Sequence, residues 1–413
     1  MLFTSFANYG AGLLIERQSG TKYAKVSLVI IIIINLLLLI SFKYGGFIYD
    51  NINYWIKLPF TRPENTLPVG ISFYTFMVIS YVVDIYRKEI KAQRNPLNFL
   101  MFISLFQHLV AGPIVRYSHI EGQVERRRVD WLKISDGVSR FCLGLFKKVV
   151  IANVAGVLVD KYLGTQLYDL SSYESWFGII MFSIQLYFDF SGYSDMAIGL
   201  AKLFGFDFHE NFRHPYAAVS VADFYRRWHI SLGKFFRDYV YIPLGGNRRY
   251  HDRNIFIVWF LTGFWHGANW NFAIWGSYFG VLMVIEKHCK PLLDKTPRAM
   301  KHMYTLFLIV FSRAFFYFTD FNKLGYFIGN LFYSKNGVTP GLISDLSAHC
   351  FWFILVILFC IPWDEIYSEE HYFRIWTRKK YGSVRPIVNV LIISLCTMLL
   401  VNATFNPFLY TRF

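Results

Sequence analysis

Low charge, high aromatic content and long uncharged runs predict an all-α, polytopic membrane protein. Of the 413 residues, 55% are hydrophobic, 20% are aromatic and only 17% are charged. A typical soluble domain has about a quarter of its residues charged. Uncharged runs recur along the chain, and a helix needs about 20 apolar residues to cross a bilayer. We therefore expect residues 1–413 to form a single integral-membrane domain with about eight to ten transmembrane or re-entrant helices.

The charge balance is strongly basic. Lys and Arg number 42 and Asp and Glu 27, which gives a net charge of +15. Membrane proteins collect Lys and Arg on cytoplasmic loops, where these residues also contact anionic lipid. The bilayer is therefore the expected partner, and nucleic acid is not. No metal site is predicted, because the five cysteines lack the spacing of a zinc site or a disulfide framework: Cys142, Cys289, Cys350, Cys360 and Cys396.

The N-terminal part of the chain contains three uncharged runs. The first, from Val26 to Phe42, includes five successive isoleucines and is the clearest span. The second runs from Leu67 to Val83. The third, from Leu97 to Val115, has basic residues on both flanks. A segment that crosses once cannot place both flanks on the cytoplasmic side. We therefore expect it to enter the membrane and return, with a break near Gly112-Pro113.

The longest uncharged run, from Asn254 to Ile285, poses the same problem on a larger scale. Its 32 residues also lie between two basic stretches, and about 20 residues suffice for one crossing. The flanking charges favour two shorter halves that meet near 267–269 over one long tilted helix. Further spans are expected at Phe141 to Val159, Trp176 to Phe188, Met303 to Phe318, Cys350 to Trp363 and Pro386 to Ala403.

His266 lies in the middle of this longest run, within Gly263-Phe-Trp-His-Gly-Ala-Asn-Trp270. Polar groups at membrane depth are costly and are often functional. Imidazole transfers protons near neutral pH, so a buried histidine beside small residues suits a general base that activates a hydroxyl or thiol. A core histidine bonded to a nearby carbonyl is an equally good interpretation of the position alone.

A second cluster carries two cations and an imidazole. If residues 224–239 are helical, Arg226, His229, Gly233 and Arg237 share one face. That face could bind a phosphate or pyrophosphate group of a cytoplasmic substrate. Spacing alone favours a basic amphipathic helix lying on anionic lipid. A zinc site built from histidines of this region matches no known ligand spacing.

Two acids, Asp189 and Asp195, lie in otherwise apolar surroundings between 185 and 199. Both need partners there, so a structural ion pair is the favoured interpretation, and a cavity lining that contacts substrate is the alternative. The chain has no GxSxG elbow, P-loop or GxGxxG motif, and hence no recognisable nucleotide-binding fold.

Several of these segments together resemble the membrane-bound O-acyltransferase family, in the branch that O-acetylates alginate, peptidoglycan and other extracellular polymers. The resemblance runs from about Lys43 to Phe413 and rests on six motifs in the same order. They are PVGISFY at 68–74, HLVAGP at 108–113, FDFSGYSDM at 188–196, RRWHIS at 226–231, LGGNR at 244–248 and WHGAN at 265–269.

The resemblance implies roles for individual residues. It makes His266 the catalytic histidine and places His229 in the lining of the same central tunnel. The C-terminal FLYTRF at 408–413 is similar to an acyl-transfer motif in which a tyrosine, here Tyr410, accepts the acyl group. The other expected substrate-binding residues are Arg226, Arg237, Asp189, Asp195, Trp265 and Asn269.

The resemblance further implies an enzyme of the bacterial cytoplasmic membrane that moves an acyl group, most simply acetyl, from a cytoplasmic thioester such as acetyl-CoA. No tightly bound cofactor is expected. An extracytoplasmic SGNH or esterase-like acetyltransferase would be the partner, and a polysaccharide would be the acceptor. A flippase with a substrate site at mid-depth is the alternative from another class, and transfer of D-alanyl to teichoic acid is a further one. Relatives of this branch usually carry about two more hydrophobic segments before the counterpart of Phe3, so either the N-terminus is truncated or misannotated or this variant is shorter.

Overall fold

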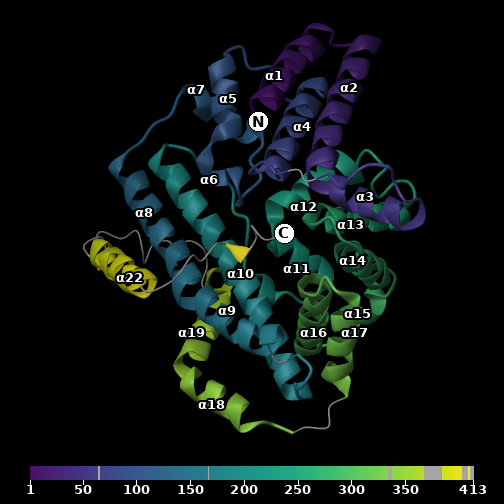
Figure 1. Cartoon of the computed structure of the whole chain (residues 1–413). Helices are drawn as coiled ribbons and strands as arrows, with labels where there is room; N and C mark the ends of the chain where they lie inside the picture. Colours follow the sequence, from purple (N-terminus) through teal and green to yellow (C-terminus); the bar gives the residue numbers. More distant parts are fainter. Residues whose placement is uncertain (64–65, 166, 334–336, 367–383, 402–407, 410–413) are drawn as a thin grey trace.

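The computed structural model describes residues 1–63, 66–165, 167–333, 337–366, 384–401 and 408–409, and all regular structure within them is helical (Figure 1). The α-helices are α1 Leu2–Arg17, α2 Lys22–Leu39, α3 Gly45–Trp55, α4 Ile71–Tyr86, α5 Pro96–Ser104, α6 Phe106–Leu109, α7 Tyr117–Glu125, α8 Trp131–Phe146, α9 Asn153–Val159, α10 Ser172–Leu203, α11 Val221–Arg227, α12 Ile230–Phe236, α13 His251–His266, α14 Trp270–His288, α15 Lys290–Lys295, α16 Arg298–Tyr317, α17 Phe321–Phe332, α18 Pro340–Ala348, α19 Cys350–Cys360, α20 Trp363–Ile366 and α22 Val384–Val401. Short turns of other helical types are η1 Ile40–Tyr44, η2 Lys147–Ala152, η3 Asp160–Thr165, η4 Pro215–Ala217 and η5 Arg237–Tyr241.

Helices α1, α2 and α4 form one end of the molecule, at the top of Figure 1. The buried amides of Asn8 and Asn35 exchange two hydrogen bonds of 2.9 Å between α1 and α2. Such reciprocal bonds satisfy two polar groups that the apolar helices would otherwise leave unpaired. Beyond α2, the helix continues through η1 into α3, so that Lys22–Trp55 is one apolar segment of 34 residues. This segment confirms the predicted span from Val26 to Phe42 and extends it.

The centre of the molecule is α10, which packs against α8, η2 and α9. The contact between α8 and α10 is close because glycines face each other across it. A Cβ atom on Gly144 would lie 2.4 Å from the carbonyl oxygen of Gly192, which no other residue could tolerate without moving the helices apart. At the side of this pair, α22 packs along α8. It is the yellow helix at the left of Figure 1.

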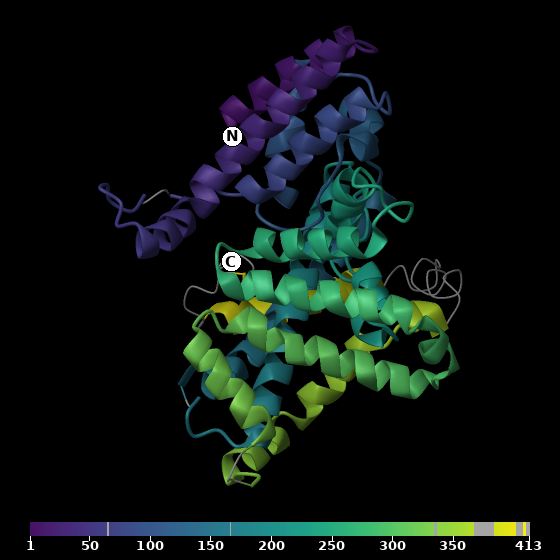
Figure 2. The same cartoon turned by 90° about the vertical axis from the view of Figure 1, so that its right-hand side faces the viewer.

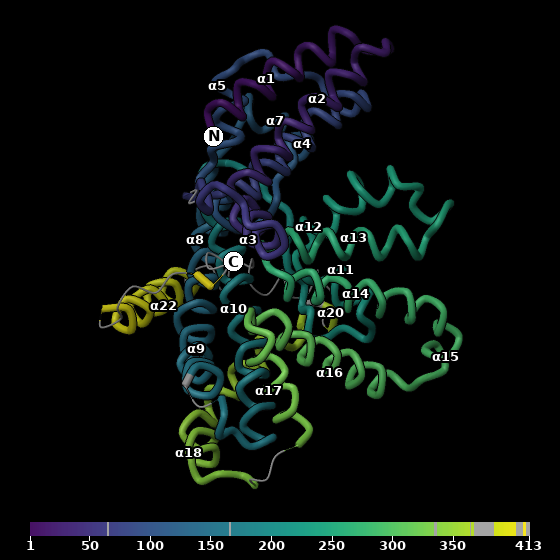
Figure 3. Tube along the Cα trace, turned by 45° about the vertical axis from the view of Figure 1, so that its right-hand side comes forward, coloured from purple at the N-terminus to yellow at the C-terminus, as the bar shows by residue number. Residues whose placement is uncertain are grey.

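Helices α13 and α14 form a hairpin, and α14 packs in turn against α16 (Figures 2 and 3). Helix α13 ends at His266 and α14 begins at Trp270. The predicted division of the longest uncharged run near 267–269 is therefore confirmed. Gly263 and Gly276 face each other inside the hairpin, where a Cβ atom on Gly263 would lie 2.3 Å from the carbonyl oxygen of Phe272.

The segment from Leu97 to Val115 is also divided as expected. It consists of α5, the short α6 and a non-helical turn in which Gly112 has a φ of +97°. The break at Gly112-Pro113 is confirmed. A second break, at Leu105 between α5 and α6, was not predicted.

The expected number of eight to ten membrane helices is not confirmed. By length and composition, three helical segments within the described residues could cross a membrane, namely Lys22–Trp55, Trp131–Gly164 and Val384–Val401. A fourth would be α18 with α19, which are bent by 64°. Two reasons lower the count: α10, α14 and α16 are long enough but not apolar enough, and helix breaks shorten other uncharged runs. Helix α13, for example, has 16 residues, fewer than the roughly 20 that a crossing requires.

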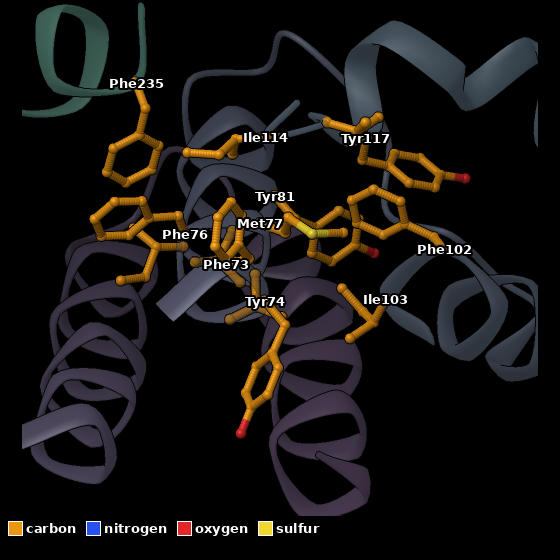
Figure 4. Packing of buried hydrophobic residues seen from close by; sticks show 14 of the residues in the cluster. Phe73, Tyr74, Phe76, Met77, Tyr81, Phe102, Ile103, Ile114, Tyr117 and Phe235 are labelled. Carbon is orange, nitrogen blue, oxygen red and sulfur yellow. The ribbon is translucent and has the colours of Figure 1, made fainter. Parts of the chain in front are cut away.

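Aromatic packing connects α4 to α12 and to the end of α13. Figure 4 shows Phe235 of α12 lying over Phe76 of α4, and the two rings stack with centroids 4.0 Å apart. Phe76 also stacks on Trp265 at 5.4 Å, and Phe73 meets the same indole edge-on. These contacts fix the end of α13, where His266 lies.

Candidate active site

His266 lies where two cavities meet. Its buried side chain contacts the rings of Trp265, Trp275 and Phe316 at centroid distances of 5.0 to 5.3 Å. It lines a cavity of about 560 Å³, which we call the basic cavity because Arg226, Lys234 and Arg237 also line it. It also lines a small cavity of about 290 Å³ that is bounded by residues 67–73. His266 is therefore shared by the linings of two cavities.

A third, wider cavity continues from the small one. It has a volume of about 710 Å³ and shares Lys43 with the small cavity. Its lining is polar and includes Asp50, Arg62 and Asn269. The basic, small and wide cavities thus follow one another through His266 and Lys43. Trp265, expected to contact substrate, lines the small cavity, and Asn269 lines the wide cavity.

The basic cavity gathers the second predicted cluster, but not on one helix. Helix α11 ends at Arg227, and His229 has a left-handed φ of +44° before α12 begins. The prediction of a continuous helix is therefore wrong. Arg226, His229, Gly233 and Arg237 nevertheless all line the same cavity. The two arginine side chains are 71% and 67% exposed, which places the guanidinium groups at the entrance.

The break at His229 is stabilised by a distant residue, the buried Asn211. The Asn211 carbonyl oxygen accepts a backbone hydrogen bond from Ile230 of 2.9 Å. Its side-chain oxygen lies 3.2 Å from Nδ1 of His229 and accepts a bond of 2.8 Å from the Ser231 hydroxyl. The local sequence of residues 224–239 contains no sign of this contact, which explains why helical periodicity alone misplaced the cluster.

Lys43 and Tyr44 hold the end of α13, and the sequence analysis did not identify either as a site residue. The Lys43 Nζ donates to the carbonyl oxygens of Trp265 at 2.5 Å and His266 at 3.3 Å. The Tyr44 hydroxyl donates to the carbonyl oxygen of Phe264 at 2.9 Å. A helix C-terminus leaves its last carbonyl groups without intrahelical partners. The π-helical turn η1 supplies partners here, and such turns are frequent at functional sites.

Asp189 and Asp195 both form buried ion pairs, the favoured interpretation of their sequence context. Asp195 pairs with Arg140 and Lys147, each at 2.6 Å. Asp189 pairs with Lys148, and its second oxygen accepts a hydrogen bond of 2.7 Å from the backbone N–H of Leu409. Neither acid lines the basic, small or wide cavity.

The C-terminal motif begins where Asp189 accepts the Leu409 N–H, a contact that we call the Asp189 anchor. Phe408 packs edge-on against Tyr193 at 4.8 Å, and the Lys148 ammonium lies 4.8 Å from the Phe408 ring centroid. Phe190, next to Asp189 in α10, contacts the His229 ring at 4.7 Å. Residues 408–409 are thus held by α10, the same helix that contacts His229 in the lining of the basic cavity. Tyr410 lies outside the described residues.

A pair of histidines lies beside the basic cavity, where Lys234 lines both the cavity and their small pocket. The rings of His119 and His209 are 4.4 Å apart. Burial, reinforced by the neighbouring His209 imidazole and the cations Arg116 and Lys234, lowers the pKa of His119 to about 4. Burial and the same two cations also lower the pKa of His209. Both imidazoles are therefore neutral near pH 7. Among the described residues, no group of three or more histidine, cysteine or acidic side chains is arranged to bind a metal ion.

Comparison with protein families shows which family has this arrangement of motifs. Residues 27–328 match the model of MBOAT, the membrane-bound O-acyltransferase family. The chain belongs to this family. The matched region contains the α13–α14 hairpin, His229 and His266, and most of the residues that line the three cavities. It confirms the resemblance that the sequence motifs indicated.

Individual relatives of this membrane-bound O-acyltransferase have related activities. The chain is 40% identical over 320 residues to a probable alginate O-acetylase, AlgI, of Pseudomonas putida, covering 75% of this chain and 65% of the relative. It is 37% identical over 310 residues to a peptidoglycan O-acetyltransferase of Helicobacter pylori, covering 68% and 59%. A teichoic acid D-alanyltransferase of Bacillus subtilis is 28% identical over 251 residues, covering 54% and 60%. The chain thus spans less than two thirds of the length of these relatives.

Proposed function

We propose that this membrane-bound O-acyltransferase transfers an acetyl group from a cytoplasmic thioester, acetyl-CoA, toward an extracytoplasmic polysaccharide. The observation that supports this most strongly is the position of His266, which lines both the basic cavity and the small cavity. The phosphates of the acyl donor would bind Arg226 and Arg237 at the entrance of the basic cavity, because guanidinium groups bind phosphate through paired hydrogen bonds.

The reaction proposed at His266 is a single acyl transfer. The imidazole accepts the proton of an attacking hydroxyl while the hydroxyl oxygen bonds to the thioester carbonyl carbon. The carbon–sulfur bond then breaks, and the thiolate leaves with the proton that His266 had accepted. The products are an oxygen ester and free CoA, and no further reactant is required. The rings that contact the His266 imidazole belong to Trp265, Trp275 and Phe316.

The extracytoplasmic part of the proposal concerns the acyl acceptor and its partner. Tyr410, in the motif that starts at the Asp189 anchor, would receive the acetyl group, and an SGNH or esterase-like transferase outside the cell membrane would pass it to the polymer. The names of the alginate and peptidoglycan acetylating relatives support acetyl over D-alanyl, because these relatives match at higher identity and over more of the chain than the D-alanyltransferase does.

Replacement of His266 by alanine tests the proposal. The purified protein in detergent is given acetyl-CoA, and release of free CoA is followed with a thiol reagent. We expect His266→Ala to reduce the rate at least about a hundredfold, since a general base contributes roughly 10²–10⁴-fold. His288→Ala is the matched control, because His288 lies exposed at the other end of the same hairpin. CoA release by His266→Ala at the wild-type rate would exclude the proposed base, and no release by the wild-type protein would favour a transporter.

A further inference from the structure

An apolar groove lies outside the three cavities of the candidate active site. It has a volume of about 960 Å³ and shares no lining residue with the basic, small or wide cavity. Its walls come from α10, α16 and α19 and from the turn η4. Helix α19 belongs with α18 to a bent pair that is apolar enough to cross a membrane. We therefore expect the groove to face the hydrocarbon of the bilayer, and the proposed reaction gives it no role.

One face of α16 changes from charged to apolar along this groove. Arg298, His302, Leu306 and Val310 all line it, and their spacing of four residues places them along one side of the helix. The first two carry a cation and an imidazole, and the last two carry only hydrocarbon. At 1.5 Å per residue, the series is about 18 Å long, which is close to the roughly 15 Å of hydrocarbon in one leaflet. The groove thus has the polarity and the length of a membrane lipid.

Polar side chains in the wall of the groove bond to the protein itself. The Tyr216 hydroxyl donates to the carbonyl oxygen of Ser183 at 2.6 Å, and the Ser183 hydroxyl donates to that of Ile179 at 2.9 Å. The Trp176 indole donates to the carbonyl oxygen of Leu331 at 3.1 Å. Tyr216, Ser183 and Trp176 line the groove and need no hydrogen bond from its occupant. This wall therefore suits an acyl chain, which can offer none.

The charged end of the groove has groups that suit a phosphate and its substituents. The exposed Arg298 side chain forms no ion pair or hydrogen bond with another described residue. Helix α16 begins at Arg298 without a side-chain cap and without an acid in its first turn, and the N–H groups at such a helix start attract phosphate. His302 donates from Nδ1 to the carbonyl oxygen of Ala218 at 2.9 Å. Its Nε2 is therefore the nitrogen that can bond to a ligand.

We propose that this groove binds one anionic phospholipid with hydroxyl groups in its headgroup, as in phosphatidylglycerol. The phosphate lies at Arg298 and the start of α16, and an acyl chain lies between α10, α16 and α19. Basic residues gather at this end of α16, as they do on cytoplasmic loops; they are Lys290, Lys295, Arg298 and Lys301. The cytoplasmic leaflet carries the anionic lipids, and basic pockets between helices bind their headgroups. A glycerol hydroxyl can donate to Nε2 of His302, whereas a choline headgroup cannot.

Two variants with matched controls test the charge and the groove separately. Arg298→Gln removes the cation, and Lys295→Gln is its control, because Lys295 is exposed three residues earlier and does not line the groove. Ile357→Trp fills the groove from α19 without a change in charge. Ile354→Trp is its control, since both isoleucines are exposed on α19 and Ile354 does not line the groove. Each delipidated protein in detergent is titrated with phosphatidylglycerol or phosphatidylcholine, and native mass spectrometry counts the bound lipid.

We expect wild type to bind one phosphatidylglycerol at least about fivefold more tightly than phosphatidylcholine, because one cation near an anionic headgroup contributes roughly this factor. Arg298→Gln should lose most of this preference, and Ile357→Trp should lose the tightly bound lipid. Both control variants should resemble wild type. Equal affinity of wild type for the two lipids would overturn the proposal. So would a loss of preference in Lys295→Gln as large as that in Arg298→Gln.

Two further results would also overturn it. Unchanged lipid binding by Ile357→Trp would place the lipid elsewhere on the protein. A dimer of wild type that Ile357→Trp dissociates and Ile354→Trp does not would assign the groove to a second copy of the chain. Lipid binding is measured without acetyl-CoA, so neither its presence nor its absence depends on the acyl transfer proposed above.

Discussion

At the scale of single residues, Asp189 combines an ion pair with a contact to the end of the chain. One oxygen pairs with Lys148 and the other accepts the Leu409 N–H. The side chains of Asp189 and Lys148 are 2% and 9% exposed. Removal of one partner of such a pair leaves a buried charge without compensation, and that residual charge accounts for most of the loss in stability.

We therefore expect Asp189→Ala to lower the free energy of unfolding by about 3–5 kcal/mol, the loss measured for broken buried pairs. The double variant Lys148→Met with Asp189→Leu should lose less than Asp189→Ala alone, because it removes both charges of this pair. Asp294→Ala is the control. Asp294 and its partner Lys290 are 61% and 70% exposed, so the expected loss is below about 1 kcal/mol. Unfolding in detergent measures all three, and a loss in the double variant as large as that in Asp189→Ala would contradict the account.

Residue patterns in the sequence predicted part of this site. His266 was identified because it is the one histidine in the longest uncharged run, and Asp189 and Asp195 because acids in apolar surroundings need partners. Arg313 was missed, although it is the one charged residue within the predicted span from Met303 to Phe318. A cation at that depth is itself a signal of function. Its burial against the Trp228 ring, by contrast, depends on tertiary packing.

At the scale of elements, η1 connects the N-terminal span to the α13–α14 hairpin. Lys43 and Tyr44 project from this turn onto the last three carbonyl groups of α13. The π-helical geometry adds a residue to one turn, which rotates the following side chains relative to a regular α-helix. The turn thereby fixes the backbone that carries His266.

We expect Lys43→Met and Tyr44→Phe to slow acyl transfer without preventing membrane insertion. Loss of the Lys43 contacts should lower the single-turnover rate constant about tenfold to a hundredfold, because small displacements of a catalytic group have effects of this size. Tyr44→Phe removes one hydrogen bond and should have a smaller effect. Tyr49→Phe is the matched control, since its hydroxyl donates to the carbonyl oxygen of Phe60, away from α13. Equal rate constants for Tyr44→Phe and Tyr49→Phe would refute the positioning role.

Element boundaries were predictable only where charge marked them. The division of Asn254 to Ile285 followed from basic residues at both ends, and the structure places the break between His266 and Trp270. The break at His229 was not predictable, because the 3.6-residue period continues through it. Asn211, 18 residues away, stabilises the left-handed conformation there. Long-range hydrogen bonds of this kind override local periodicity.

At the scale of the whole molecule, the basic, small and wide cavities form a series connected through His266 and Lys43. Exposed arginines lie at the entrance of the first cavity, as expected for the cytoplasmic side. The central claim of the account is that an acetyl group passes along this series, whereas CoA remains on the cytoplasmic side because its charge prevents it from entering the bilayer.

Sealed inside-out membrane vesicles that contain the chain and its native acceptor system test this claim most directly. Radiolabelled acetyl-CoA is added outside, where the cytoplasmic face is exposed. The account predicts that label appears on polymer inside the vesicles, that an added esterase removes it only after detergent treatment, and that vesicles with His266→Ala acquire none. Label that appears only when acetyl-CoA is sealed inside the vesicles, or equal labelling with His266→Ala, would contradict it.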